Sequence, residues 1–385
     1  MLNKLQRRLQ ARQVQDLIRQ RLTLDSPQGA KVTVNGQTLL NFSSNDYLGL
    51  ANHPKLIEAI RTSSKTIGAG SGASHLIVGH SHEHHQLEEE LAEFLGTEKA
   101  LLFSTGFMAN LGVLTSLLDK RDLIVQDKLN HASLIDGGIA SEAKNSRFAH
   151  KDMASLERQL QHAAETKLIV SDGVFSMDGD IAPINELVEM KQKHKASLMI
   201  DDAHGFGVLG NQGKGSLEHF ALEQSEAEIY MATLGKAIGG FGAFVASSKD
   251  LIESLIQFAR SYIYTTAMPA AIAAANRAGL MLIQSEPERR EQLKKNIRYF
   301  RALAFEQDLP LMDSETAIQP LLLKHNDKAL RISQELKDKG ILALAIRPPT
   351  VPIHTARLRI TLSASHNKSH IEQLVDNLSK SLKVA

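Results

Sequence analysis

Short apolar runs alternate with amphipathic helical blocks along most of the chain. From Pro54 onward, the runs lie at residues 101–103, 123–125, 168–170, 198–200, 229–231 and 242–245. Runs of this length, separated by helical patterns, are typical of buried strands in a mostly parallel sheet that helices cover. The pattern therefore predicts an α/β domain built on one large sheet.

The pattern changes at the N-terminal end. Leu2, Leu5, Leu9, Leu17 and Ile18 recur at near-helical spacing, and the first 22 residues hold six basic side chains with one acid. We interpret this stretch as a helical arm rather than a mitochondrial transit peptide, since it lacks serines and an apolar block. Residues 31–40 then read as a hairpin, two alternating strands around an Asn-Gly turn.

A second α/β pattern occupies the C-terminal end. After helical sequence over 251–260 and 269–305, the strand candidates 318–323, 342–346 and 357–362 alternate with helical patterns at 329–339 and 370–382. This indicates a second, smaller α/β domain. We expect an arm and hairpin over residues 1–45, a large domain over 46–275 and a small domain over 276–385.

Composition narrows the possible functions. The 385 residues include 44 Lys and Arg against 43 Asp and Glu, a net charge of +1 that gives no reason to expect a nucleic-acid partner. The longest apolar stretches are about half as long as a membrane span needs. The chain has no cysteine, which excludes disulfides, thiol nucleophiles and cysteine-ligated zinc and suits a reducing compartment such as the cytoplasm.

The most informative segments lie at the ends of two predicted strands. The strand at 197–200 delivers Asp201, Asp202 and His204 to its carboxyl end, where open α/β sheets bind their ligands. The next run ends in Thr233-Leu-Gly-Lys236, which places a lysine among small residues and invites covalent chemistry with an aldehyde. The alternative is that Lys236 is an ordinary surface lysine in contact with water, as most lysines are. A phosphate-binding Walker loop does not fit, because no Ser or Thr follows Lys236.

Further segments predict groups for a phosphate and an aromatic ring. The strand at 101–103 continues through Ser-Thr-Gly106-Phe107 into a helix, whose first N–H groups favour a phosphate. His131 offers an imidazole face for stacking, although a lone histidine is more often structural. Ser176 follows the strand at 168–170 and reaches the same sheet edge. The glycines at 68–72 resemble a dinucleotide loop weakly, since helical sequence precedes them.

A phosphate cradle, a stacking ring, a carboxylate and a lysine together fit pyridoxal 5′-phosphate. The segments 41–50 (NFSSNDYLGL), 175–179 (FSMDG), 201–205 (DDAHG) and 233–236 (TLGK) resemble the α-oxoamine synthases, which are fold-type I pyridoxal-phosphate enzymes. The resemblance extends from the arm to the C-terminal domain. It implies a large domain with a mostly parallel seven-stranded sheet, a smaller C-terminal α/β domain and a homodimer with shared active sites.

The resemblance also implies roles for single residues. Lys236 would bond to the cofactor aldehyde and move the substrate α-proton, Asp201 would pair with the pyridine nitrogen, and His131 would stack on the ring and assist catalysis. The remaining cofactor contacts that it implies are Gly106, Phe107, Ser176, His204 and Thr233, with Thr265 and Thr266 reaching the phosphate of the neighbouring subunit. Arg359 with Asn45 is the candidate for the substrate α-carboxylate, and His131 is a further substrate contact. Arg19, Arg347 and Thr350 are candidates for the acyl substrate.

The segments 147–150 (RFAH), 345–352 (AIRPPTVP) and 355–361 (TARLRIT) resemble one member of the family. This member serves biotin synthesis and joins L-alanine to a pimeloyl thioester, with release of carbon dioxide and a thiol. The sequence leaves open whether the acyl group arrives on coenzyme A or on an acyl carrier protein.

Other hypotheses for the function remain open. A related enzyme, 2-amino-3-ketobutyrate CoA ligase, or another family member, would use glycine. A pyridoxal-phosphate-binding regulator would need an attached DNA-binding domain, and residues 1–50 offer no such element.

The histidines at 80, 82, 84 and 85 invite a metal site, but nothing else in the sequence completes one, so we expect no metal.

Overall fold

The computed structural model describes residues 1–383, which form two compact units. The sheet unit comprises Leu50–Ser176 and Asp180–Arg290, and the terminal unit comprises Met1–Gly49, Met177–Gly179 and the chain from Glu291 onward. No helix among these 383 residues is both long and apolar enough to cross a bilayer. The domain boundaries expected from the sequence stay a prediction.

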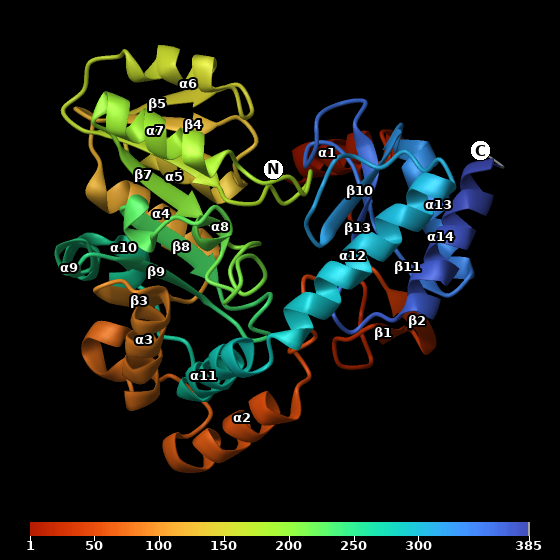
Figure 1. Cartoon of the computed structure of the whole chain (residues 1–385), viewed down its shortest axis with the longest axis horizontal. Helices are drawn as coiled ribbons and strands as arrows, with labels where there is room; N and C mark the ends of the chain where they lie inside the picture. The colour runs from red at the N-terminus through yellow and green to blue at the C-terminus, as the bar shows by residue number, and fades with distance from the viewer. Residues whose placement is uncertain (384–385) are drawn as a thin grey trace. The chain divides into compact units, whose positions relative to one another are not determined.

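A seven-stranded sheet forms the centre of the sheet unit (Figure 1), as the resemblance implied. Its order is β3-β9-β8-β7-β6-β4-β5, and β9 alone runs antiparallel to its neighbours in this part of the chain. The strands are β3 (Lys99–Phe103), β4 (Leu123–Asp127), β5 (Lys144–Phe148), β6 (Lys167–Asp172), β7 (Ser197–Asp201), β8 (Ile229–Thr233) and β9 (Ala243–Ser247). The carboxyl ends of β3, β4, β6, β7 and β8 therefore meet at one edge, where a parallel sheet binds its ligands.

Helices cover both faces of this sheet, because its strands are apolar on both sides. On one face, alternate strand residues such as Met231 and Val245 pack with α4 (Gly106–Leu117), α5 (Ala132–Ala140) and α9 (Lys249–Phe258). On the other face, Phe244 meets Phe206, which in turn contacts Phe94 of α3 (His82–Leu95). The unit also contains α2 (Pro54–Ile67), α6 (Met153–Leu160), α7 (Ile184–His194), α8 (Ser216–His219), α10 (Arg260–Ile263) and α11 (Ala270–Ser285).

The terminal unit is a smaller α/β arrangement, as predicted. The hairpin β1 (Lys31–Val34) and β2 (Gln37–Asn41) turns at Asn35-Gly36, both with positive φ, and pairs with β11 (Ile341–Leu342). A second sheet has the order β10 (Ile318–Lys324), β13 (Ala356–Thr361) and β12 (Ala345–Ile346). The helices are α1 (Leu2–Val14), α12 (Glu288–Glu306), α13 (Asn326–Asp338) and α14 (Lys368–Lys383).

Three local predictions differ from the structure. The polar strand β5, with the pattern Lys-Asn-Ser-Arg-Phe, lacks the apolar run that marked the others and went unrecognised. The expected strand at 342–346 is two short strands in different sheets. The arm helix ends at Val14, since Asp16 adopts a positive φ of 56°, so Leu17 and Ile18 lie beyond it.

Candidate active site

A cavity of about 220 Å³ opens at the carboxyl edge of the large sheet, within the sheet unit. Eight of the ten predicted cofactor contacts line it: Gly106, Phe107, His131, Ser176, Asp201, His204, Thr233 and Lys236. The structure therefore brings together segments that lie up to 130 positions apart in the sequence. The other two, Thr265 and Thr266, do not line this cavity; they lie between α10 and α11, where the carbonyl of Thr266 accepts a hydrogen bond from Ser104 Oγ.

The amine of Lys236 lies against an imidazole. Its Nζ is 2.8 Å from Nε2 of His204, in the turn that follows β7. Lys236 itself follows β8 by three residues, and the chain then turns through Gly239 at φ 78°. A Cβ at Gly239 would stand 2.5 Å from the backbone of Leu50, so only glycine allows this close approach. The packing of this turn positions the lysine at the cavity.

A chain of hydrogen bonds joins four residues that line the cavity. Asn110 on α4 donates through Nδ2 to Asp201 Oδ2 at 2.7 Å and to Ser133 Oγ at 2.8 Å. Ser133 Oγ accepts the hydrogen bond from Asn110, so the Ser133 hydroxyl proton is available to His131 Nδ1, which lies 2.7 Å away. The backbone N–H of Ser133 donates to the same nitrogen. His131 Nδ1 is thus an acceptor, so its neutral ring carries the proton on Nε2.

Asp172 is a second carboxyl group at the same edge. It is paired with Asp201 across β6 and β7, and its Oδ2 accepts the backbone N–H of His131 at 3.0 Å. Burial and the neighbouring Asp201 raise the pKa of Asp172 well above its usual range. Two adjacent buried carboxyl groups do not both ionise easily, so Asp172 keeps its proton more readily than an isolated aspartate does.

Asp202 serves the fold rather than the cavity, because adjacent residues at the end of a strand point to opposite faces. Its Oδ2 accepts the Ser216 N–H at 2.6 Å and the Tyr230 hydroxyl at 2.9 Å. A Cβ at Gly205 or Gly215 would stand 2.1 or 2.0 Å from its carboxylate oxygens. Burial raises the pKa of Asp202 to about 6.

The start of α4, which lines the cavity through Gly106 and Phe107, suits a phosphate. The side chain of Thr105 caps α4 by accepting the Met108 N–H at 3.2 Å, and Gly106 is the first residue of this twelve-residue helix. A Cβ at Gly106 would stand 2.9 Å from Thr233 Cγ2, so the glycine lets backbone and side chain meet there. The first N–H groups of a helix attract an anion.

These residues fit pyridoxal 5′-phosphate. A hydrogen-bonded carboxylate for the ring nitrogen, an amine for the aldehyde and a helix start for the phosphate all line one cavity. The sequence analysis did not assign Asn110 or Asp172. Asn110 lies four residues after Gly106 and so on the same helix face, and Asp172 ends an apolar strand at the ligand-binding edge; both signals were available.

The candidate carboxylate-binding pair lies in the terminal unit. Arg359 on β13 is 8% exposed, and its Nη1 donates to Asn45 Oδ1 and to Thr361 Oγ1, both at 3.0 Å. Burial of the nearby Tyr47 raises the pKa of its hydroxyl, and the Arg359 guanidinium partly offsets this. The sequence-predicted pair is therefore in direct contact within this unit.

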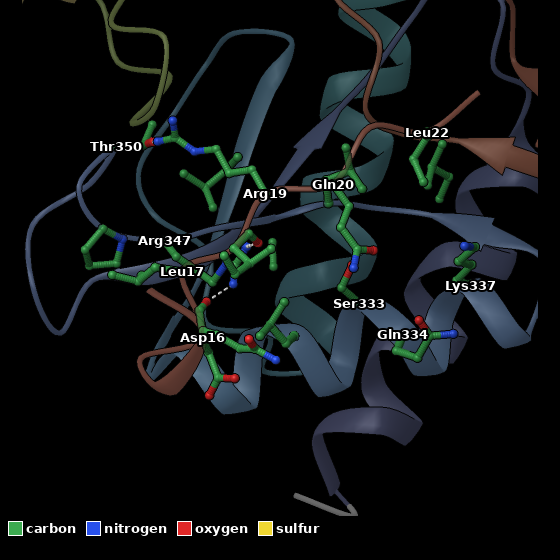
Figure 2. Close-up of a pocket in the computed structure, with 18 residues that line it drawn as sticks. Asp16, Leu17, Arg19, Gln20, Leu22, Ser333, Gln334, Lys337, Arg347 and Thr350 are labelled. Carbon is green, nitrogen blue, oxygen red and sulfur yellow. Dashed lines mark hydrogen bonds between the residues drawn. The ribbon is translucent and has the colours of Figure 1, made fainter. Parts of the chain in front are cut away.

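The three candidate acyl-binding residues also meet within the terminal unit. They line a pocket of about 780 Å³ between the end of the arm and the segment 330–350 (Figure 2). Arg19 donates to Thr350 Oγ1 at 3.1 Å, while Arg347 donates to the backbone carbonyls of Asp16 and Ile18. The arm is thus fastened to this pocket by the side chain of Arg347.

Comparisons with known proteins agree with this geometry. The sequence profile of the class I and II aminotransferases matches residues 37–378. The 8-amino-7-oxononanoate synthase of Cellvibrio japonicus is 55% identical over 96% of this chain and 93% of its own. A solved 8-amino-7-oxononanoate synthase from Francisella tularensis is 34% identical, with a TM-score of 0.79 over 90% of this chain and 98% of its own.

A solved serine palmitoyltransferase carrying pyridoxal phosphate superposes with a TM-score of 0.95 and 28% identity over 100% of this chain and 98% of its own. The protein is accordingly a pyridoxal-phosphate-dependent acyltransferase. The chain belongs to the class I and II aminotransferase family and, within it, to the 8-amino-7-oxononanoate synthases.

Proposed function

We propose that this α-oxoamine synthase of the biotin pathway condenses L-alanine with a pimeloyl thioester. One carbon–carbon bond forms between the alanine α-carbon and the thioester carbonyl; the thiol and carbon dioxide leave, and 8-amino-7-oxononanoate is the product. The observation that carries the proposal is 55% identity to a synthase of this name along 96% of the chain. The rival reading, an enzyme that uses glycine, would share the same cavity.

Pyridoxal phosphate, when bound, supplies the electron sink that stabilises negative charge at the amino-acid α-carbon. Asp201 would pair with the ring nitrogen and keep its proton in place, and Asn110 orients the Asp201 carboxyl group through its hydrogen bond. The N-terminus of α4 and the hydroxyl of Thr233 would hold the phosphate. These residues support binding and orientation of the cofactor.

Proton transfer falls to Lys236. Its Nζ takes the α-proton of alanine and returns a proton after carbon dioxide has left. His204 Nε2 lies 2.8 Å from Nζ and holds the amine in place. With the cofactor bound, this nitrogen would instead donate a hydrogen bond to its phenolic oxygen. His131 would stack on the ring of the bound cofactor, and its Nε2–H would be available to the substrate carboxylate or the developing oxyanion.

Arginines account for the substrate anions. We assign the alanine carboxylate to Arg359 with Asn45, since a guanidinium fork matches a carboxylate in two bonds. We assign the acyl donor to Arg19, Arg347 and Thr350, which line one pocket. Coenzyme A and an acyl carrier protein present the same thioester group. The assay should therefore include both carriers.

The first experiment reduces the holoenzyme with borohydride and maps the modified residue by mass spectrometry. The label is expected on Lys236, and Lys236→Ala should lose both the label and turnover. Lys191→Ala, a lysine that pairs with Glu228 outside the cavity, is the matched control and should keep both. Label at another position would refute the assignment of Lys236.

The second experiment tests the substrates. L-Alanine and glycine are each paired with pimeloyl and acetyl thioesters, while thiol release and carbon dioxide are followed together. Alanine with the pimeloyl donor should exceed the other pairs by at least about tenfold in kcat/KM, a difference of about 1.4 kcal/mol. A preference for glycine with acetyl-CoA would replace this proposal with the ligase.

A homodimer in the cytoplasm is the final part of the proposal. It rests on the family and on Thr265 and Thr266, which lie outside the chain's own cavity as contacts to a neighbour's phosphate require. Sedimentation would measure the assembly. Mixed dimers, in which one subunit carries Thr266→Val and the other Lys236→Ala, would show whose cavity this segment serves.

A further inference from the structure

The helix α3 begins in a group of histidines that the proposed reaction does not use. His84, the most buried of them, has a structural role: its Nδ1 caps the helix through Ser81, and its Nε2 contacts the Met268 carbonyl at 2.8 Å. His82 is exposed. Neither explains why His80 and His85 lie beside them.

His80 and His85 converge on one carboxylate. His85 and Glu88 are three residues apart and so share a face of α3. His80 Nε2 lies 3.9 Å from Glu88 Oε2, and one ligand atom from each of the three residues falls within 4.8 Å of the others. Zinc bonds of about 2.0–2.1 Å place ligand atoms roughly 3.3 Å apart, so a modest inward rotation closes the group.

His85 can make that movement at little cost. Its side chain is 56% exposed, and its contact is with Glu89 Oε1 at 3.2 Å. An exposed ion pair of this kind contributes little stability, so a metal ion can displace it.

A second layer of contacts already orients the other two side chains. His80 Nδ1 lies 3.1 Å from His75 Nδ1, and the His75 ring stacks on Tyr262. With the proton of this bond on His80, Nε2 carries the lone pair that faces Glu88. The other carboxylate oxygen of Glu88 accepts the Leu102 N–H at 2.9 Å, which fixes Oε2 toward the histidines. Such supporting hydrogen bonds are typical of metal ligands.

The chemistry of the three donor groups favours a transition-metal ion. Imidazole with carboxylate is a donor set that suits zinc and its first-row neighbours rather than magnesium or calcium.

We propose that His80, His85 and Glu88 bind one divalent transition-metal ion of the zinc class, with water completing the coordination on the exposed side of His85. None of the three lines the cofactor cavity. The ion would join the start of α3 to β3 through Glu88 and Leu102 and would stabilise the sheet unit without entering the reaction.

The test titrates the pyridoxal-phosphate-loaded enzyme with Co²⁺ and Zn²⁺ and follows heat, the Co²⁺ visible spectrum and the melting temperature. The parent should bind one ion per chain at this site and melt at a higher temperature with zinc. His85→Gln should weaken binding at least about tenfold and remove the thermal shift. His85 is exposed, so this variant is expected to fold as the parent does.

His82→Gln is the matched control, because it removes a neighbouring exposed histidine of the same helix. This variant should bind the ion with the affinity of the parent, and zinc should raise its melting temperature by the same amount. Glu88→Gln should weaken binding as His85→Gln does. Equal affinity of the parent and His85→Gln, or no saturable binding by the parent, would overturn the proposal.

Discussion

Asn110 and Asp201 are both buried and joined by a hydrogen bond of 2.7 Å from the amide Nδ2 to the carboxylate Oδ2. The second Nδ2 proton goes to Ser133. With the amide turned over, its oxygen would face the carboxylate, so charge decides the orientation. Asn110 Oδ1 is left without a partner among residues 1–383, a cost that the bond to a charged group offsets.

We predict that Asn110→Ala weakens cofactor binding. Hydrogen bonds to charged groups contribute about 1.5–3 kcal/mol, which corresponds to a Kd for pyridoxal phosphate roughly 10- to 100-fold higher. Absorbance titration of the apoenzyme measures it. Asn145→Ala, which removes the partner of Gln126 on β4, is the control and should leave the Kd unchanged. Parent-like affinity in Asn110→Ala would contradict the role of this bond.

A second prediction concerns the contact between Gly106 and Thr233. Gly106→Ala places a Cβ 2.9 Å from Thr233 Cγ2, too close without movement of the helix start. Overpacking costs about 1–3 kcal/mol, and here the displacement falls on the N–H groups assigned to the phosphate. The cofactor Kd should therefore rise roughly 5- to 100-fold.

The double variant Gly106→Ala/Thr233→Ser separates crowding from other effects, because serine keeps the hydroxyl and lacks Cγ2. It should recover most of the lost affinity, while Thr233→Ser alone should bind nearly as the parent does. A double variant as weak as Gly106→Ala would mean that crowding by Thr233 is not the cause.

The sequence predicted the strands that are apolar and missed the one that is not. Six strands of the large sheet follow from short apolar runs, whereas β5 is an edge strand whose four polar residues are exposed or half-buried. The segment 341–346 shows a second limit. Its apolar residues indicate extended chain, but partners distant in sequence decide that it divides between two sheets.

The site was predictable where chemistry marks the residue type. Lys236, Asp201 and His204 lie at or just after the ends of apolar strands, where residue type and position together indicate their chemistry. Asn110 lies inside a helix, and its importance depends on Asp201, which is 91 positions away and meets it through packing alone. The spacing of residues along the sequence does not show which side chains meet in the fold. Contacts such as that of Asn110 with Asp201 can therefore be found only in the structure.

A third prediction compares two arginines on β13. Arg359→Lys should raise the KM for the amino acid about tenfold or more with a smaller effect on kcat, because an ammonium cannot form the paired bonds of a guanidinium. Steady-state kinetics with varied alanine measures this. Unchanged KM would remove Arg359 from the substrate assignment.

Arg357→Lys is the contrasting variant, two residues away on the same strand. Arg357 is 3% exposed and donates to Asp178 Oδ1 at 2.5 Å and to the Thr355 and Met177 carbonyls. We expect this variant to lower the melting temperature, since buried guanidinium bonds are lost, and to leave the KM for alanine close to that of the parent.

A final prediction follows from His150, whose Nδ1 and Nε2 lie 3.0 Å from Asp127 and 2.9 Å from Asp180. Burial alone would lower its pKa, but the bonds to the two carboxylates outweigh burial and raise the pKa to about 9. The folded state therefore binds the proton more tightly than the unfolded chain, whose histidine titrates near 6.5. The stabilisation, at most about 3 kcal/mol, is complete below pH 6.5 and is lost as the pH rises through about 9.

Urea unfolding of the parent and of His150→Gln at pH 6 and at pH 9.5 tests this dependence. The parent should be more stable than the variant at pH 6, and the difference should shrink at pH 9.5, because most of His150 is then neutral in the folded state as well as in the unfolded chain. His162→Gln, at an exposed position, should match the parent at both pH values. A stability difference that stays constant across this range would show that packing, rather than the charge of the imidazolium between Asp127 and Asp180, sets the contribution of His150.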